Sequence, residues 1–409
     1  MGKMDEWLVE PQPRLGVAGL LVLLVMGSLV APLSLDMYTP AVPGMAEYFS
    51  TTDEIVNLTL VGYYLFLAVG LLIFGPLSDK YGRKPVLVAG IAAYCASSMA
   101  CALSASIWML VAARVVQALG SGAMSAVCTA VVKDAVREDM RERMLAIIQV
   151  MFVIGPVAAP IIGAGILAIT DWRGTFWTLA LISAAELVMA LLFHETLPVE
   201  KRLGVGVFAT LGHLGVVARN PGFTAFLLIT SAWELGYMGY VSVGSYIYIE
   251  YFGFPPIGYS LFFAVAALTC AIGPVAWLRI SRVMTKRKFT TIAIIASLAI
   301  GAGELVLGSA GAFVFCALFT AFAFFESSVR PYAVNVLLSQ QENDTGSASA
   351  LINFTRTFMG VIGMFAVVAP VFSDYISAVA WLMAGGMAFA LVGWAALLRS
   401  SAPLKGVKG

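Results

Sequence analysis

The chain has 409 residues, of which 60% are hydrophobic and only 11% are charged. Soluble domains carry about 25% charged residues, so a water-soluble fold could not bury this much apolar surface. The formal net charge of +1 gives no reason to expect a nucleic-acid partner or an acidic substrate. We therefore predict an all-α membrane protein.

A helix that crosses hydrocarbon needs about 20 mostly apolar residues. Twelve runs of this kind follow one another along the chain. The first six fall at 15–40, 55–78, 85–104, 106–132, 143–169 and 173–194. The other six fall at 222–249, 256–281, 289–308, 312–338, 346–371 and 376–398. The first run follows Lys3 and Arg14 but is long enough to span a membrane, so we predict a span and not a cleaved signal peptide.

The polar stretch 195–221 is the longest interruption between these runs. It predicts a central cytoplasmic linker between two six-helix halves, 1–194 and 222–409. The halves show a weak internal repeat, because Gly75 and Gly273 each precede a proline and one offset also brings Asp36 onto Glu234. Parallel six-span repeats build transporters that bind their substrate between the halves, so the repeat favours a transporter.

Lysine and arginine placement predicts the orientation, because cytoplasmic loops carry an excess of these residues. Basic residues gather in alternate connections, at 80–84, 133–143, 201–219, 279–288 and 399–408. The opposite connections hold Arg173 as their one cation, beside several acids. Both termini are therefore predicted to be cytoplasmic.

Once the charges assigned to the loops are set aside, eight charged residues remain inside the apolar runs, where a buried charge costs at least about 2.5–3.5 kcal/mol. They are Asp36, Arg114, Glu186, Glu234, Glu304, Glu326, Arg330 and Arg356. Each needs an oppositely charged partner, a watery cavity or a proton, unless it lies at the edge of its span. For Glu186 and Glu304 we favour a structural role or a position at a span edge.

Asp36 and Arg114 reach comparable depth on the first and fourth spans and are predicted to face one another. Asp36 could then exchange its partner for a proton or a substrate, and a fixed salt bridge is the alternative. Arg114 cannot lose its proton, so we expect it to tune or orient the groups at this site and not to carry the proton itself. Glu326 and Arg330, four residues apart on one helix, are predicted to neutralise one another, and Arg356 could share their network.

Glu234 lies among aromatic residues near the middle of the seventh span, which suits a cationic or amphipathic ligand. We name it as a candidate for substrate binding and for a second coupling acid, with a structural role as the alternative. The candidate substrate-binding residues are Asp36, Tyr63, Tyr64, Trp233, Glu234, Tyr237 and Tyr240. Some of the tyrosines could instead belong to an interfacial aromatic belt.

Enzyme motifs such as HExxH, GxxxxGK[ST] and GxSxG do not occur in the sequence. The five cysteines show neither metal-ligand nor disulfide spacing. We predict that the protein is not an enzyme, binds no metal and uses no cofactor apart from the proton as coupling ion.

The connection from Gly75 to Val86 reads GPLSDKYGRKPV and resembles the signature loop of the major facilitator superfamily along nearly its whole length. In this loop Gly75 is expected to let helices approach and Gly82 to permit a tight turn. Asp79 with Arg83 and Lys84 is expected to form a cytoplasmic charge latch. The resemblance implies that this latch stabilises the outward-facing state.

Three further segments sharpen the resemblance. Residues 110–123 resemble the fourth-helix motif of proton-coupled members, and 194–198 resemble the Pro-Glu-Thr-Leu ending common in drug exporters. Residues 155–164 resemble the fifth-helix antiporter motif, although alanines replace two of its glycines. Its prolines and glycines predict a closely packed hinge, or alternatively a plain packing kink. The hinge residues are Gly155, Pro156, Pro160 and Gly163.

The first span is the most discriminating, because residues 35–43, LDMYTPAVP, resemble a segment of the bicyclomycin/chloramphenicol-resistance (Bcr/CflA-type) branch of drug:proton antiporters. Some relatives carry a second acid about eight residues before this aspartate, where this chain has Ser28. The resemblance implies a monomeric, proton-driven exporter of lipophilic drugs, phenicol-like or cationic, in contact with lipid in a bacterial inner membrane. A proton symporter that imports a small metabolite and a membrane sensor without transport are the alternatives.

Overall fold

The computed structural model describes residues 8–9, 12–202, 215, 217–340, 345–400 and 404–407. The chain divides into two compact units, Met1–Val207 and Phe208–Gly409. The boundary falls inside the stretch 195–221, much of which, at 203–214 and 216, lies outside the described residues.

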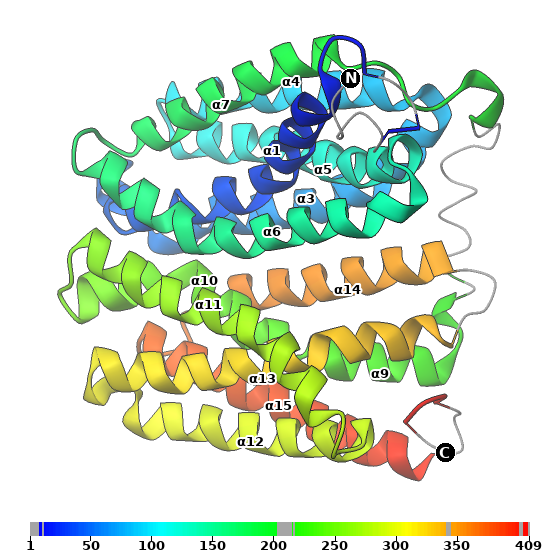
Figure 1. Ribbon diagram of the computed structural model, residues 1–409. Helices are drawn as coiled ribbons and strands as arrows, with labels where there is room; N and C mark the ends of the chain where they lie inside the picture. Colours follow the sequence, from blue (N-terminus) through cyan, green and yellow to red (C-terminus); the bar gives the residue numbers. More distant parts are fainter. Residues whose placement is uncertain are drawn as a thin grey trace. The chain divides into compact units, whose positions relative to one another are not determined.

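The described part of the first unit contains six long helices (Figure 1). They are α1 (Gly16–Asp36), α3 (Asp53–Tyr81), α4 (Arg83–Ala102), α5 (Ile107–Ala135), α6 (Glu138–Leu167) and α7 (Arg173–Leu192). Three short elements join or follow them, the 3₁₀-helices η2 (Thr39–Gly44) and η3 (Val199–Lys201) and the single helical turn α2 (Met45–Tyr48).

The second unit is helical as well. Its described elements are α9 (Pro221–Ser231), α10 (Trp233–Tyr246), the π-helix η4 (Ile247–Tyr251), α11 (Pro256–Ile280), α12 (Lys286–Leu307), the 3₁₀-helix η5 (Gly308–Ala310), α13 (Ala312–Leu338), α14 (Thr345–Ala366) and α15 (Tyr375–Arg399).

The twelve predicted spans correspond to these helices, and the predicted all-α membrane fold is confirmed. Ten helical segments of the described chain are long and apolar enough to cross a membrane. The fifth predicted span corresponds to α6, whose described apolar part is Ile154–Leu167. The seventh corresponds to two helices, α9 and α10, which meet at Ala232.

Helix α1 ends earlier than its apolar run because of two prolines. Pro40 and Pro43 cannot donate backbone hydrogen bonds to a continuing α-helix, and the chain turns into the 3₁₀-helix η2 after Met37. A helix that ends leaves its last carbonyl groups without intrahelical partners. The carbonyl of Ser34 is one of these groups, and Asp36 is the last residue of the helix.

Close packing in the first unit depends on small residues, as expected for helices that associate in a membrane. A Cβ atom added at Gly122 of α5 would lie 2.8 Å from the Cα of Gly70 on α3, and one at Gly120 would lie 2.7 Å from the carbonyl oxygen of Gly90 on α4. Gly120 and Gly122 belong to the segment that resembles the fourth-helix motif. Their lack of a side chain brings α5 against two neighbours at once.

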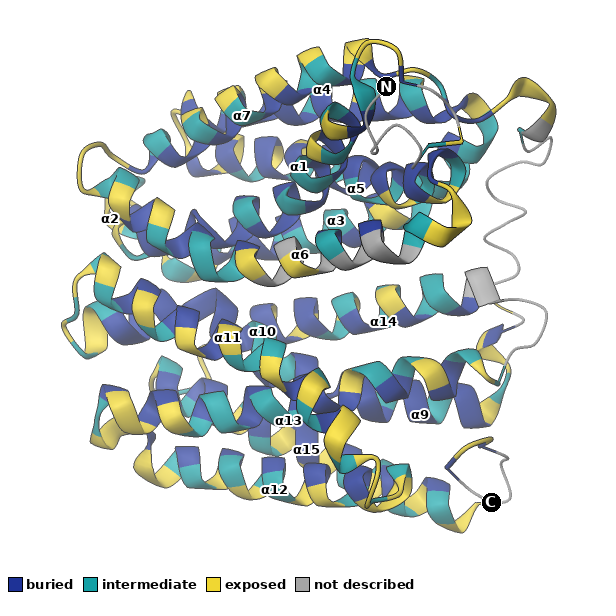
Figure 2. Cartoon of the chain, in the orientation of Figure 1, coloured by how far each residue is buried: buried dark blue, intermediate teal, exposed yellow. Residues whose placement is uncertain are grey.

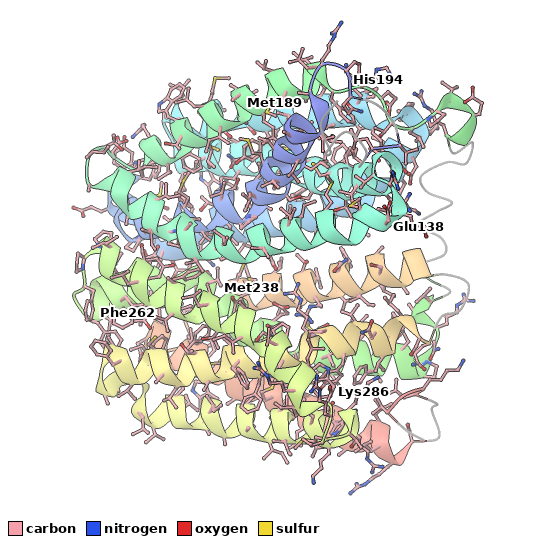
Figure 3. All side chains as sticks on the ribbon, viewed as in Figure 1. Glu138, Met189, His194, Met238, Phe262 and Lys286 are labelled. Carbon is pink, nitrogen blue, oxygen red and sulfur yellow. The ribbon has the colours of Figure 1, made fainter. Side chains whose placement is uncertain are left out.

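Each unit keeps apolar side chains on its outer faces as well as in its interior (Figures 2 and 3). Leu181 of α7 is 71% exposed and Val392 of α15 is 71% exposed, whereas Arg114 and Glu186 are fully buried. Hydrocarbon on the outside accounts for this distribution, because lipid chains are as apolar as leucine.

The break between α9 and α10 depends on glycines of its neighbours. A Cβ atom at Gly363 of α14 would collide with the carbonyl oxygen of Leu235, and one at Gly386 of α15 would lie 2.8 Å from the carbonyl oxygen of Ala232. Only a residue without a side chain lets α14 and α15 approach the backbone this closely.

We expect Gly363→Ala to lower the free energy of unfolding by about 1–3 kcal/mol, the usual cost of overpacking. Thermal unfolding of the purified protein in detergent measures the effect. Gly385→Ala is the matched control, because a Cβ atom there meets no atom within 4 Å. Equal melting temperatures for the two variants would contradict the close approach at Leu235.

Candidate functional site

Arg114 on α5 holds together the centre of the first unit. Its guanidinium is fully buried and donates to the backbone carbonyl of Ser34 on α1 at 3.0 Å and to the side-chain oxygen of Gln117 at 2.8 Å. A longer bond, 3.4 Å, reaches the carbonyl of Thr59 on α3. Arg114 therefore caps the carboxyl end of α1, where a positive charge is favoured by the helix dipole.

Aromatic rings surround the rest of this guanidinium. Its carbon lies 4.2 Å from the ring centre of Tyr63, 5.3 Å from that of Tyr38 and 5.7 Å from that of Phe176. Ring faces attract a cation most strongly where water is absent. Tyr63, a predicted substrate-binding residue, is thus fully buried against Arg114, whereas its neighbour Tyr64 is half-buried.

Asp36 lies at the end of the helix that Arg114 caps, yet the two side chains form no ion pair. Among the described residues, no lysine or arginine lies within 4.0 Å of the Asp36 carboxylate. The side chain is only 5% exposed, and its charge acts on Tyr63, the ring that covers Arg114. The structure therefore brings the predicted pair into one region but leaves the acid without a cation in contact.

Helix α6 packs directly on the segment that carries Asp36. A Cβ atom at Gly163 would collide with the carbonyl group of Met37, and one at Gly155 would lie 3.1 Å from Pro32 of α1. Pro156 and Pro160 lie within the helix between these two glycines. The four residues predicted to form the hinge thus lie on the helix against which the end of α1 rests, and α6 is continuous through them.

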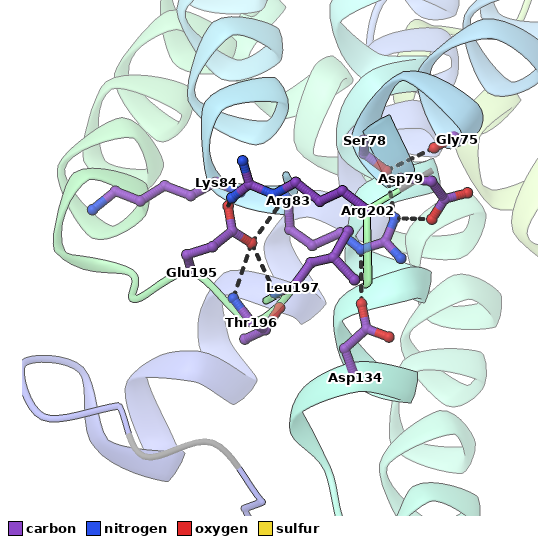
Figure 4. Close-up of polar contacts among 10 residues, drawn as sticks. All are labelled: Gly75, Ser78, Asp79, Arg83, Lys84, Asp134, Glu195, Thr196, Leu197 and Arg202. Carbon is purple, nitrogen blue, oxygen red and sulfur yellow. Dashed lines mark hydrogen bonds and ion pairs between the residues drawn. The ribbon is translucent and has the colours of Figure 1, made fainter. Parts of the chain in front are cut away.

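The loop between α3 and α4 forms a cluster of charges, as Figure 4 shows. Arg83 contacts Asp79 at 2.6 Å and Asp134, at the end of α5, at 2.8 Å. Gly82 has a φ of +104°, so the tight turn predicted for this glycine is present. By contrast, a Cβ atom at Gly75 meets nothing within 4 Å, so no described helix approaches closely at that glycine.

Glu195 completes this cluster from the segment that resembles the drug-exporter ending. Its carboxylate accepts the backbone N–H groups of Arg83 at 2.9 Å and Lys84 at 3.1 Å, which begin α4. It also accepts the N–H groups of Thr196 and Leu197 (Figure 4). A carboxylate at a helix N-terminus satisfies otherwise unpaired donors and favours the helix dipole. Glu195 therefore connects the segment that follows α7 to the signature loop between α3 and α4.

Three buried charges meet in the second unit. The Nη2 atom of Arg356 on α14 donates to Glu234 on α10 and to Glu326 on α13, the latter at 2.5 Å. Each of these side chains is less than 10% exposed. The predicted mutual pairing of Glu326 with Arg330 is therefore wrong, because Arg330 is exposed and Arg356 reaches the acid instead. Arg330 still acts on Glu234 through its charge.

The aromatic residues of the seventh span belong mostly to the packed interior of their unit. Trp233 is fully buried and donates its indole N–H to Ser297 of α12 at 3.0 Å. Tyr240 is 1% exposed and stacks on Phe319 of α13 with ring centres 3.7 Å apart. Tyr237 is half-buried and is the most accessible of the three.

Several residues of these networks were not named as site candidates. Ser34 bonds Tyr94, and Gln117 donates to Ser98 at 2.7 Å, so α4 is joined to the Arg114 network by hydroxyl groups. Asp134 and Glu195 complete the loop cluster. In the sequence, only their place could have indicated Asp134 and Glu195: both follow spans that end on the same side of the membrane as the signature loop.

Residues 24–364 match the Major Facilitator Superfamily, which is more than half of the chain. The chain belongs to the major facilitator superfamily. Members of this superfamily are transporters of small-molecule substrates, so the protein is placed among transporters.

Relatives of known sequence agree with this membership. The chain is 28% identical to the uncharacterized MFS-type transporter YdgK of Bacillus subtilis, over 85% of this chain and 87% of that one. It is 33% identical to a chloramphenicol resistance protein of Pseudomonas aeruginosa, over 62% and 60% of the two chains. It is 28% identical to a bicyclomycin resistance protein homolog of Haemophilus influenzae, over 59% and 61%.

The likeness to the bicyclomycin/chloramphenicol-resistance branch, which the first span predicted, is thereby confirmed. The two drug-resistance alignments span about three fifths of those proteins. Together with the apolar helices, the matches also confirm the predicted multi-pass location in a bacterial inner membrane.

Solved structures share the fold of this major facilitator protein. A peptide transporter POT variant in complex with sulfate aligns with a TM-score of 0.75 and 14% identity, over 94% of this chain and 95% of that one. A D-xylose-proton symporter aligns with a TM-score of 0.69 and 14% identity, over 94% and 98%. At this identity the likeness concerns the fold alone.

For this transporter we expect Arg356→Gln to lower the free energy of unfolding by about 3–5 kcal/mol, because it leaves two buried carboxylates without their cation. Chemical unfolding of the purified protein in detergent measures this loss. The triple variant that also carries Glu234→Gln and Glu326→Gln is expected to regain most of the stability. If Arg356→Gln alone unfolds at the wild-type denaturant concentration, the three charges do not depend on one another.

Proposed function

We propose that this protein exports small lipophilic or cationic drugs, phenicols among them, across the inner membrane in exchange for protons, by alternating access. The main support is the buried Asp36 carboxylate, which has no cation within ion-pair distance among the described residues. The names of the relatives from Pseudomonas aeruginosa and Haemophilus influenzae agree with drug efflux.

Asp36 suits a coupling role because its environment favours a change of state. An ionised carboxylate within a membrane span needs a partner, a proton or water. Arg114 is held by the Ser34 carbonyl, the Gln117 side chain and three rings, so it supplies positive potential nearby without neutralising the acid by contact. A proton and a bound drug can therefore compete for the Asp36 carboxylate, because either of them can neutralise or bind it.

The exchange then follows from competition. A proton that reaches Asp36 from outside removes the negative charge and weakens the hold on a bound drug, which leaves. The protonated carrier returns to its inward-open state and loses the proton to the cytoplasm. One charge that crosses 100 mV supplies about 2.3 kcal/mol, which is sufficient for useful drug accumulation.

The Arg356 network supports binding of cationic drugs in the second unit. Two carboxylates, Glu234 and Glu326, share the single Nη2 atom of Arg356. This arrangement holds one more acid than the guanidinium can neutralise, and the exposed Arg330 also acts on Glu234 through its charge. A drug cation can supply the missing positive charge, with the half-buried ring of Tyr237 close along the same helix.

We expect Asp36→Asn to abolish drug-driven proton movement, because asparagine neither binds nor releases a proton. Inverted membrane vesicles loaded with a pH dye measure it: wild-type vesicles lose protons when a phenicol or a cationic drug is added. Asp171→Asn is the matched control, since Asp171 is exposed in the connection between α6 and α7.

Intact proton movement in Asp36→Asn would remove Asp36 from the coupling role. Uptake of protons together with an external nutrient in right-side-out cells would instead favour an importing symporter. The absence of any drug-driven or nutrient-driven flux in the wild type would contradict proton-coupled transport itself.

We expect Glu234→Gln to reduce export of cationic drugs by roughly tenfold or more, the factor that corresponds to about 1.4 kcal/mol, while export of neutral drugs changes little. Arg356 remains paired with Glu326 in this variant, so the unit should stay folded. Initial export rates of one cationic and one neutral drug, measured in the same vesicles, separate the two effects. An equal fall for both drugs would contradict charge recognition by Glu234.

A further inference from the structure

Glu186 on α7 is a buried acid that the proposed exchange at Asp36 does not use. The side chain is fully buried, and neither carboxyl oxygen has a hydrogen-bond partner in the described part of the chain. No described lysine or arginine pairs with it. It also lies within α7, six residues before the end of the helix, so of the two predicted alternatives, a structural role or an edge position, it does not fit the edge position.

A glycine makes room for this carboxyl against α1. A Cβ atom at Gly27 would lie 3.0 Å from Oε1 of Glu186 and 2.5 Å from Sγ of Cys128 on α5. Cys128, itself buried, is the titratable side chain that faces Glu186. Residues of three helices, Gly27 of α1, Cys128 of α5 and Glu186 of α7, therefore meet around this acid.

Such an acid is stable only with its proton bound. An isolated carboxylate in an apolar interior costs far more than a neutral carboxyl group, and no partner here offsets that cost. The neutral group still has one O–H donor and acceptor capacity that no described residue satisfies. The site can therefore release its proton only when water or another partner reaches it.

Helix α1 connects this site to Asp36. Gly27 and Asp36 are nine residues apart on the same helix, which corresponds to about 14 Å along its axis. The residue next to Gly27 is Ser28, and the hydroxyl of Ser34 lies between the two acids along the helix. A movement of α1 away from α7 would open the contact at Gly27 and the surroundings of Asp36 together.

We propose that Glu186 is a second proton-binding site of the first unit, which releases its proton when α1 separates from α7 and takes one up when they pack again. In the release step the O–H bond of the carboxyl breaks, and the proton passes to water. This proposal deepens the proposed drug:proton exchange and rests on it for its role in transport. Next to Gly27, helix α1 carries Ser28 and not an acid, so the carboxyl group at this place comes from Glu186 of α7.

Infrared spectroscopy of the purified protein in lipid tests proton binding without any need for transport. We expect the carbonyl-stretch band of a buried protonated carboxyl to disappear in Glu186→Gln and, in the wild type, to lose intensity when a phenicol is added or the pH is raised. Glu304→Gln is the matched control, because Glu304 on α12 is equally buried and its oxygens also lack partners among the described residues. Its substitution should leave the drug-sensitive band in place.

A second variant separates the loss of the Glu186 carboxyl from a folding defect of Glu186→Gln. Gly27→Ala places a methyl group against Cys128 and Glu186, and together with Cys128→Ala it should shift the same band while Glu186 is retained. A Glu186 band that responds to neither drug nor pH would overturn the proposal. A band that responds to pH in a protein with no drug-driven proton flux would uphold proton binding at Glu186 and would contradict the proposed function alone.

Discussion

A guanidinium that cannot lose its proton lies buried at the centre of the first unit, and no acid of the described chain forms an ion pair with it. Hydrocarbon offers no water to such a charge, so the protein must surround it with dipoles and ring faces. Arg114 obtains them from the carbonyl of Ser34, the amide oxygen of Gln117 and the ring of Tyr63. Asp36 is not among the groups that contact this cation, and no other lysine or arginine of the described chain contacts the acid.

The second unit meets the same constraint in another way. There Arg356 contacts two carboxylates directly, so each acid shares its cation with a competitor. Asp36 and Glu234 occupy corresponding places in the sequence repeat, yet Asp36 has no ion pair with any described residue and Glu234 belongs to an ionic network. This difference agrees with separate tasks, proton exchange in the first unit and recognition of drug charge in the second.

Backbone breaks and glycines position both sets of charges. Pro40 and Pro43 end α1 and thereby free the carbonyl that Arg114 binds, while Gly163 lets α6 rest on the turn that follows. In the second unit the interruption at Ala232 places Glu234 in the first turn of α10, and Gly363 admits α14, which carries Arg356. Discontinuous helices of this kind are typical of binding sites in transporters.

The sequence was sufficient to predict the spans, because apolar length is set by the thickness of the bilayer. It also located the charged residues within the spans, and all of them except Arg330 are buried in the structure. It could not predict their partners, because helical spacing does not reveal how each helix is rotated about its axis. Glu326 was therefore assigned first to Arg330 on its own helix, with Arg356 as a possible further member of the network, and Arg356 is the residue that reaches the acid.

The most direct test of this account is the number of protons that the purified protein releases when it binds a drug in weakly buffered detergent solution. The account predicts that a saturating neutral phenicol releases protons from the wild type and that Asp36→Asn still binds the drug but releases fewer. Equal proton release from the two proteins, or drug binding by the wild type without any proton release, would contradict competition between drug and proton at Asp36.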